Sequence, residues 1–266
     1  MNAPAPSRAV VTGASGGIGR AIARRLIEDG ATVANVDARI DPEAELLCGP
    51  AMTTFVADLA DPAAVADAFG KIDALFGDQP PELMVACAAA SFAAPFLDIR
   101  AEQLDRLLAV NVAGTFHACQ QAARRMVGRR AGHIVVITSV AAEQAWAGEM
   151  VYCATKAAQR GLVQGMAIEL APFGILVNAV GPGIVDHRSA AMARTRDDGP
   201  VLAHDLDRTP LGRFASPEEI AEAVGFLART TWINGQTIYV DGGFLAAGLG
   251  YFGAAKEKIS ETAPKR

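Results

Sequence analysis

Short apolar runs alternate along this chain with longer segments of helical periodicity. The runs carry apolar residues at consecutive positions, which is the pattern of strands buried on both faces. A parallel sheet covered by helices on both sides buries such strands. We therefore predict an α/β fold, a doubly wound parallel sheet of the Rossmann type with about seven strands, which binds ligands at the strands' carboxyl ends. The predicted strands are 9–12, 31–36, 52–57, 83–87, 133–138, 174–180 and 236–240.

The segments between these strands predict helices on both faces of the sheet. No internal repeat or linker divides the chain, so residues 1–266 are interpreted as a single dinucleotide-binding domain. Residues 183–215 leave the carboxyl end of a strand as a long segment with scattered Gly and Pro, which is typical of a substrate loop or lid. The C-terminal tail, 244–266, runs from apolar residues into a polar end. The predicted helices are 17–29, 62–76, 100–128, 148–171 and 216–229.

Composition excludes several classes of function. The formal net charge is −5 and no basic stripe emerges, which argues against a nucleic-acid or anionic-membrane partner. No apolar stretch approaches the roughly 20 residues of a membrane span, and the N-terminus lacks a signal sequence. The four cysteines show neither CxxC nor Cys/His metal spacing, so we expect reduced thiols in a cytoplasmic protein and no metal site.

A glycine-rich run, Thr12–Gly19, follows the first strand and opens the first helix. Glycines permit a tight turn and close approach of the backbone, and the free N–H groups of a helix N-terminus can bind a pyrophosphate. A glycine-rich turn without a ligand is the structural alternative. In the dinucleotide interpretation, the cofactor contacts are Gly13, Ser15, Gly17, Ile18 and Gly19.

Carboxylates follow the second and third strands. Asp37 can accept hydrogen bonds from the adenosine ribose and would repel a 2′-phosphate, which favours NAD over NADP. Arg39 is the counter-argument, because a guanidinium could pair with that phosphate. Asp58 can accept a hydrogen bond from the adenine amino group, with Leu59 beside it, because Asp61 is the better helix cap before Pro62.

Tyr152 and Lys156 lie four residues apart in a predicted helix, so their side chains share one helix face. A free phenol is a poor base at neutral pH, but a neighbouring ammonium and an oxidised nicotinamide lower its pKa. Ser139 follows a strand at its carboxyl edge, where its hydroxyl can hold a substrate oxygen. Asn111 interrupts an apolar helical stretch, and its buried amide must be bonded to backbone or to ordered water.

Each of these residues has a structural alternative when taken alone. Tyr–Lys pairs occur on surface helices, Ser139 could cap a helix, and Asn111 could only bridge backbone. The joint occurrence of all four with the glycine-rich run favours an active site.

These motifs resemble the short-chain dehydrogenase/reductase family in its single-domain form, from Arg8 to Gly243. Thr12–Gly19 matches TGxxxGxG, and Ser139, Tyr152 and Lys156 match the Ser-X12-Tyr-X3-Lys site. Asn111 matches the helix asparagine, Pro182-Gly183 the turn after the sixth strand, and Asp241-Gly242-Gly243 the closing turn.

The resemblance implies an NAD-dependent oxidoreductase that interconverts a secondary alcohol and a ketone. It implies that Tyr152 is the acid/base and that Lys156 lowers its pKa and binds the nicotinamide ribose. It further implies that Ser139 orients the reacting oxygen and that Asn111 helps to hold a water in a proton relay. An uncharged Gly16, where NADP-using members often carry a basic residue, again favours NAD.

Two positions depart from the family pattern. Ala86–Ala89 stand where an Asn-Asn-Ala-Gly sequence is usual, so packing must replace a bracing amide. His187 stands where a threonine usually contacts the carboxamide, and Pro182, Gly183 and Val185 remain the expected cofactor contacts of that segment.

The substrate and the assembly are less constrained. By position, Ser91, Gln144 and Trp146 should join Ser139 and Tyr152 in lining the substrate pocket. Two long helices carry apolar residues on more than one face, so we expect a homotetramer. The alternatives are a nucleotide-binding protein without turnover, an NADP-preferring ketone reductase, and an enzyme of epimerisation or dehydration.

Overall fold

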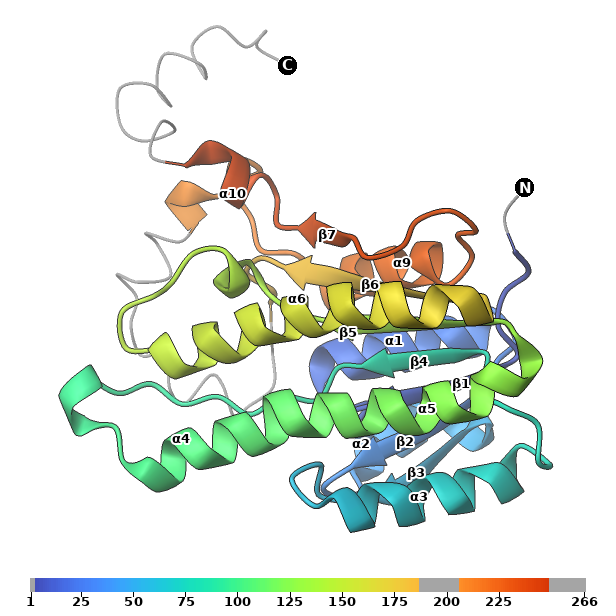
Figure 1. Cartoon of the computed structure of the whole chain (residues 1–266). Coiled ribbons are helices and arrows are strands. Elements are labelled where there is room, and N and C mark those ends of the chain that lie inside the picture. The colour runs from blue at the N-terminus through green and yellow to red at the C-terminus, as the bar shows by residue number, and fades with distance from the viewer. Residues whose placement is uncertain (1–2, 187–205, 249–266) are drawn as a thin grey trace, which may run out of the picture.

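The computed structural model describes residues 3–186 and 206–248, which form one parallel sheet of seven strands (Figure 1). The strand order is β3-β2-β1-β4-β5-β6-β7, so the winding reverses direction between β1 and β4. This confirms the doubly wound fold and places the ligand crevice at the carboxyl ends of β1 and β4. The strands are β1 (Arg8–Thr12), β2 (Thr32–Asp37), β3 (Met52–Val56), β4 (Leu83–Ala86), β5 (Gly132–Ile137), β6 (Ile175–Pro182) and β7 (Thr237–Val240).

Helices cover both faces of the sheet. In Figure 1, α3 (Pro62–Leu75), α5 (Thr115–Arg129) and α6 (Met150–Leu170) lie in front of the sheet. Behind it lie α1 (Gly17–Glu28), α2 (Pro42–Cys48) and α9 (Pro217–Leu227). The short helices α4 (Ala101–Leu107) and α10 (Phe244–Ala247) lie toward the carboxyl end of the strands. None of the helices in the described ranges is long and apolar enough to span a membrane.

The core has two halves because alternate residues of each strand point to opposite faces. Val10 and Met84 belong to the cluster under α3, α5 and α6. Val11 and Val85, their neighbours in sequence, belong to the cluster under α1, α2 and α9. All four side chains are fully buried, which explains why the strands are apolar at consecutive positions.

Helix starts follow local sequence signals. Asp41 caps α2 by accepting from the N–H groups of Glu43 and Ala44, and Asp61 caps α3 in the same way. Both helices have proline in their first turn, where its missing N–H costs nothing. The capping role expected of Asp61 is thus confirmed, whereas α2 was not predicted although Asp41-Pro42 carries the same signal.

The predicted helix 100–128 differs in its middle. It consists of α4, a π-helix (η3, Leu108–Gly114) and α5, with Asn111 at the centre of the π-helical segment. A π-helix bonds each carbonyl to the N–H five residues on, and this wider turn is common at functional sites. The tertiary contacts of Asn111, described below, accompany this local widening.

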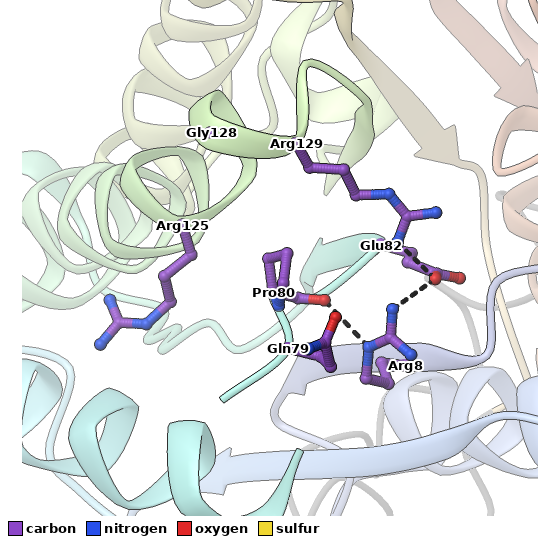
Figure 2. Close-up of a pocket in the computed structure, with 7 residues that line it drawn as sticks. All are labelled: Arg8, Gln79, Pro80, Glu82, Arg125, Gly128 and Arg129. Atoms are coloured by element: carbon purple, nitrogen blue, oxygen red, sulfur yellow. Dashed lines mark hydrogen bonds and ion pairs between the residues drawn. The ribbon is translucent and has the colours of Figure 1, made fainter. Parts of the chain in front are cut away.

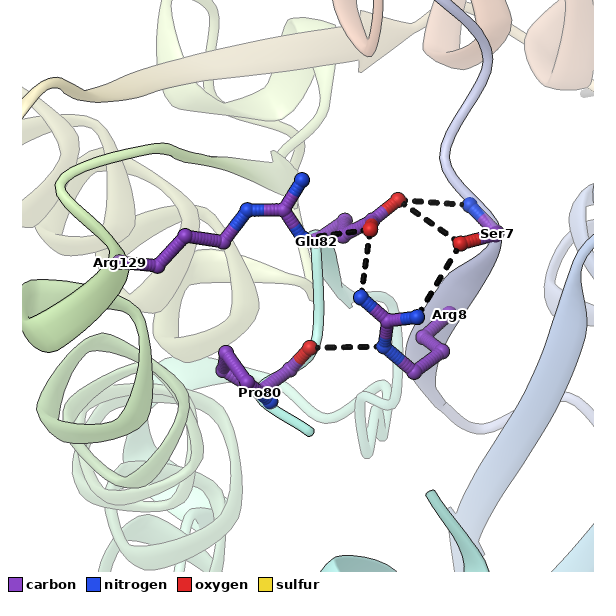
Figure 3. A network of polar contacts seen from close by, with 5 residues as sticks. All are labelled: Ser7, Arg8, Pro80, Glu82 and Arg129. Atoms are coloured by element: carbon purple, nitrogen blue, oxygen red, sulfur yellow. Dashed lines mark hydrogen bonds and ion pairs between the residues drawn. The ribbon is translucent and has the colours of Figure 1, made fainter. Parts of the chain in front are cut away.

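An open hollow of about 530 Å³ lies at the amino ends of β1 and β4 and is lined by arginines from β1 and α5 (Figure 2). Glu82 accepts hydrogen bonds there from Arg8, Arg129 and the N–H of Ser7 (Figure 3). Arg125 makes a bidentate pair with Asp73 at 2.6 and 2.7 Å. Each of these guanidinium groups is already paired, so the residues around the hollow join β1, β4, α3 and α5 structurally. The hollow also lies away from the strands' carboxyl ends.

Candidate active site

Two glycines of the glycine-rich loop, Gly13 and Gly19, leave no room for a side chain. A Cβ on Gly19 would lie 2.2 Å from the carbonyl oxygen of Gly13, and Gly13 itself has a φ of +77°. Helix α1 starts at Gly17 and Ile18 directly behind this turn, and its cap residue Gly16 offers no side-chain hydrogen bond to the first N–H groups. These N–H groups can therefore receive an anionic group such as a pyrophosphate, so the loop fits a dinucleotide.

The end of β2 holds the loop from the side. The buried Asn35 accepts from the N–H of Ala14 at 2.9 Å, and Asp37 accepts from the N–H of Ser15 at 3.2 Å. The Ser15 hydroxyl donates to the carbonyl oxygen of Arg39 at 3.3 Å. Asp37 thus lies beside the loop, where a nucleotide ribose would pass, and Arg39 is exposed nearby. Asn35 was not predicted as a site residue, although a polar residue inside an apolar strand was the available signal.

Asp58 and Leu59 follow β3. Asp58 accepts from the N–H of Ala60 at 3.0 Å and pairs with Arg106 of α4 at 2.8 Å. The hydrogen bond from Arg106 lowers the pKa of the Asp58 carboxyl. Leu59 is buried, and a Cβ on Gly114 would lie 2.7 Å from its Cβ. This close approach ties the loop after β3 to the π-helix.

The segment Ala86–Ala89, which departs from the family pattern, is held by the hydroxyl group of a neighbouring strand residue. Thr12, the last residue of β1, accepts from the N–H groups of Cys87 at 3.0 Å and Ala88 at 3.1 Å. A Cβ on Gly13 would lie 2.8 Å from the Cα of Ala88, so the small side chain there allows close packing on the loop. Burial raises the pKa of the Cys87 thiol to about 12, which makes it a packing residue and not a nucleophile.

The side chain of Asn111 is fully buried, and both its amide oxygen and its amide nitrogen are hydrogen-bonded. Its Oδ1 accepts from the N–H of Ala90 at 2.7 Å, and its Nδ2 donates to the carbonyl of Ala90 at 2.9 Å and to the Thr155 hydroxyl at 3.0 Å. The expectation that backbone satisfies this amide is confirmed. Asn111 therefore joins the strand-end segment after β4 to α6, next to Lys156.

Tyr152 and Lys156 share one face of α6 as predicted. The Lys156 Nζ lies 5.5 Å from the centroid of the Tyr152 ring, and it donates to the carbonyl of Ile137 at 2.9 Å and to Gln159 Oε1 at 3.0 Å. Burial lowers the pKa of Lys156 to about 8. Ser139 begins the short helix η4 (Val140–Ala142), and its hydroxyl accepts from the N–H of Ala141 at 3.1 Å.

The acid/base character of Tyr152 needs more than its neighbours in the chain. Burial raises the pKa of the phenol above its ordinary value, and a hydrogen bond with Ser139 opposes that rise. The lowering expected from the sequence is therefore not achieved by Lys156 at this distance. The positive charge of an oxidised nicotinamide, the other group invoked, would act in the required direction.

The end of β6 faces β7 and the closing turn. Pro182 is buried in the last pair of the ladder, and Gly183 donates its N–H to the carbonyl of Val240 at 2.9 Å. Val185 is buried and forms a bridge with Ala215, so the two ends of the loop 183–215 are joined. His187 and the middle of this loop lie outside the described residues, as do Tyr251 and Phe252 of the tail.

A wall of larger side chains stands beyond Ser139. Trp146 stacks on Phe244 of α10 with ring centroids 5.7 Å apart. Arg208 lies over the same Phe244 ring at 4.4 Å and donates to Gln144 Oε1 at 2.9 Å. The structure thus brings Gln144 and Trp146, both predicted to line the pocket, together with Phe244, which the sequence did not single out. Ser91, also predicted, is exposed on the segment after β4.

The thiols and metal-binding groups carry no further site. All four cysteines are free. Within the part of the chain that the structure describes, no cluster of three or more His, Cys, Asp and Glu side chains could hold a metal ion.

Comparison with known proteins gives matches over nearly the whole chain. A family model described as enoyl-(acyl carrier protein) reductase matches residues 13–245. L-xylulose reductase from Bos taurus is 38% identical over 244 residues, which cover 90% of this chain and 96% of that protein. Sorbitol dehydrogenase from Cereibacter sphaeroides is 36% identical over 256 residues, covering 88% of this chain and 96% of that protein.

Solved structures agree with these relatives. A gluconate 5-dehydrogenase from Burkholderia cenocepacia J2315, in complex with NADP and tartrate, has a TM-score of 0.81 and 34% identity, covering 90% of this chain and 95% of that one. A double mutant of a Serratia marcescens short-chain dehydrogenase/reductase has a TM-score of 0.81 and 34% identity, covering 91% of this chain and 99% of that one.

Proposed function

Since the chain belongs to the short-chain dehydrogenase/reductase family, we propose that Tyr152 is the acid/base of an NAD-linked interconversion of a secondary alcohol and a ketone. The chain is an oxidoreductase acting on CH–OH groups, as its named relatives are. The observation that carries the proposal for Tyr152 is its position. The phenol is linked to Ser139 and shares a helix face with Lys156, at the strand ends beside the glycine-rich loop.

In the proposed oxidation, Tyr152 takes the proton of the alcohol while the carbinol carbon loses a hydride. The bound nicotinamide supplies the hydride acceptor, and in reduction the same proton and hydride return to the ketone. Ser139 donates a hydrogen bond to the reacting oxygen, which holds it within reach of the phenol. Without substrate, the Ser139 hydroxyl is instead hydrogen-bonded to Tyr152, and this bond opposes the rise in the pKa of the phenol.

Lys156 and Asn111 support the phenol from α6 and the π-helix. Lys156 is buried on the same helix face as Tyr152, from where its ammonium would bind the nicotinamide ribose. One of its three N–H groups remains for a ribose hydroxyl after the bonds to Ile137 and Gln159 are made. Asn111 fixes α6 against the segment after β4 through Thr155 and Ala90.

NAD is the proposed cofactor. Its pyrophosphate would bind at the N-terminus of α1, because the helix start is uncapped and the turn before it is tight. The residues around it would be Gly13, Ser15, Gly17, Ile18 and Gly19. Asp37 would accept the ribose hydroxyls and repel a 2′-phosphate. NADP is bound in the related gluconate 5-dehydrogenase structure, so both cofactors belong in the test.

The remaining proposed contacts follow the strand ends. Asp58 and Leu59 would face the adenine, and Pro182, Gly183 and Val185 would flank the nicotinamide. Four free cysteines support a reducing compartment such as the cytoplasm.

The substrate proposed here is a polyhydroxylated ketone or the corresponding alcohol. Relatives are named for L-xylulose, D-erythrulose, sorbitol and gluconate, which all carry several hydroxyl groups. Gln144 offers hydrogen-bonding atoms at the pocket wall, and Ser91 and Ser139 offer hydroxyls. A (3R)-3-hydroxyacyl-CoA dehydrogenase among the relatives makes a hydroxyacyl thioester the natural comparison substrate.

The decisive experiment follows nicotinamide absorbance with purified protein, both cofactors and a panel of ketoses, polyols, sugar acids and a 3-hydroxyacyl thioester. We expect turnover of at least one polyhydroxylated compound and higher kcat/KM with NAD. If no combination of cofactor and substrate changed the absorbance, the assignment of Tyr152 as the acid/base of an oxidoreductase would be overturned. Turnover of the thioester alone would leave the mechanism intact and reject the substrate class.

A further inference from the structure

A buried glutamine lies against Lys156 and has no place in the mechanism above. Gln159 is 1% exposed and follows Lys156 by three residues on α6, so the two side chains lie on the same side of the helix. A buried amide is costly unless its donors and acceptor are all satisfied. Its partners therefore indicate what holds it there.

The hydrogen bonds of Gln159 determine the orientation of its amide. Nε2 donates to the backbone carbonyl of Asn111 at 2.8 Å and to the hydroxyl of Thr115 at 2.9 Å. A carbonyl oxygen only accepts, so the NH₂ group must face the π-helix. Oε1 must then face α6, where it accepts from Lys156 Nζ at 3.0 Å. The amide cannot be reversed without losing a bond at both ends.

The amide thus forms a bridge between the amine and the π-helix. A buried ammonium without acceptors would be forced toward its neutral form. Lys156 has two protein acceptors, Ile137 O and Gln159 Oε1. The titratable groups that face it are the Tyr152 phenol on its own helix and the Cys87 thiol after β4, while β5 contributes the Ile137 carbonyl and η3 only the uncharged Asn111. No carboxylate among the described residues is hydrogen-bonded to the amine, so the oxygen of Gln159 has no charged competitor.

We propose that Gln159 is a positioning residue that keeps Lys156 protonated and directs its remaining N–H toward the cofactor and Tyr152. This proposal rests on the role of Lys156 in the proposed function. The same bridge makes the position of Lys156 depend on the π-helix that carries Asn111.

The direct test measures the titration of Lys156 by NMR of lysines labelled with ¹³C at Cε. The chain has five lysines, Lys71, Lys156, Lys256, Lys258 and Lys265, so the Lys156 signal can be assigned with Lys156→Met. Gln159→Met removes the acceptor and should lower the pKa of Lys156 by about 1–2 units. This shift corresponds to the loss of one hydrogen bond to a charged group. Gln159→Glu places a carboxylate beside the amine and should raise the pKa of Lys156. The control Gln164→Met changes an exposed glutamine of the same helix and should leave it unchanged.

The kinetic test follows kcat and KM against pH in the oxidation direction. Gln159→Met should move the alkaline limb of the kcat profile to lower pH, and Gln159→Glu should move it up, with substrate KM little changed. A merely structural role would lower kcat by one factor at every pH. Thr115→Val, which removes one partner of the amide, should shift the limb in the same direction as Gln159→Met but less, and it serves if Gln159→Met does not fold.

The outcomes separate the two proposals. Opposite shifts of the Lys156 titration in the Met and Glu variants support the positioning role. The positioning role is overturned if the pKa of Lys156 is unchanged in a folded Gln159→Met protein. It is also overturned if the pKa is unchanged in both Thr115→Val and Gln159→Glu. Because the NMR measurement needs no turnover, an inactive wild-type protein would reject the proposed function while the titration still decides the role of Gln159.

Discussion

Lys156 Nζ lies 5.5 Å from the centroid of the Tyr152 ring and gives its hydrogen bonds to Ile137 and Gln159. These hydrogen bonds of the amine are thus directed to other groups than the phenol. This separates two roles on one helix face. In the proposed function, the phenolic oxygen exchanges a proton, whereas the amine stays charged in a buried place.

Tyr152→Phe should remove turnover and leave cofactor binding nearly intact. The phenolic oxygen carries the proton, and general acid–base catalysis contributes about 10²–10⁴-fold. Steady-state rates and the dissociation constant of NADH by fluorescence check this. A variant with kcat within a few-fold of the wild type would show that another group carries the proton.

Lys156→Met should change how stability depends on pH. Burial lowers the pKa of Lys156 from 10.5 to about 8, so between these values the unfolded chain binds more protons than the folded one. By linkage, the free energy of unfolding then rises with pH in this window, by about 3 kcal/mol in total at about 1.36 kcal/mol per unit.

Urea unfolding at fixed protein concentration, from about pH 7 to about pH 10.5, measures that rise. The wild type should gain stability relative to Lys156→Met as pH increases through the window, because the buried charge is lost. Parallel curves for the two proteins would contradict the lowered pKa.

Asp37→Ala should narrow the preference for NAD over NADP by at least about tenfold in the ratio of kcat/KM, which is about 1.4 kcal/mol. The carboxylate lies beside Ser15 of the glycine-rich loop, where it would repel a 2′-phosphate. Asp67→Asn removes a surface carboxylate of α3 and is the control. A wild-type protein that already prefers NADP would show that Arg39 outweighs Asp37.

The protein should be a homotetramer, because two separate surfaces expose large apolar side chains. Ile168 and Phe116 are 77% and 38% exposed on α6 and α5, and Phe226 and Trp232 are 49% and 94% exposed at and beyond α9. Two different two-fold interfaces build a tetramer from such surfaces.

Light scattering should give four chains per particle for the wild type and two for Ile168→Lys or Trp232→Lys. Leu46→Lys, at an 82% exposed position on α2, should leave the tetramer intact. A monomeric wild type at micromolar concentration would refute the assembly.

Phe244→Ala should weaken both the fold and the substrate pocket. The ring is 1% exposed and contacts Trp146 and Arg208, so its loss should lower the free energy of unfolding by about 3–5 kcal/mol. Substrate KM should rise more than kcat falls, because the ring supports the wall and not the reacting atoms. Leu46→Ala at the surface should stay within about 0.5 kcal/mol of the wild type.

Strands and caps were readable from the sequence because they depend on local signals. The strand predicted at 133–138 occupies Gly132–Ile137, and the helix predicted at 148–171 occupies Met150–Leu170. Their apolar patterns report burial directly. The four-residue spacing of Tyr152 and Lys156 likewise predicted that they share one face of a helix, which α6 confirms.

The contacts that depend on distant segments were not readable. The π-helix around Asn111 accompanies bonds to Ala90, Thr155 and Gln159, which come from two other parts of the chain, the segment after β4 and α6. Gln159 itself looks like any polar residue of a helix until its partners are known. Helix α2 was missed because it is short, although Asp41 and Pro42 mark its start.

The wall beyond Ser139 is assembled from separate segments that carry Gln144, Arg208 and Phe244, whereas the proton-exchanging phenol is held by α6. Under the proposed function, mutations in the wall would therefore change the substrate while the segment that holds Tyr152 stays the same. For the same reason, a laboratory search for activity on an unnatural ketone should randomise Gln144 and Trp146 first and leave α6 untouched.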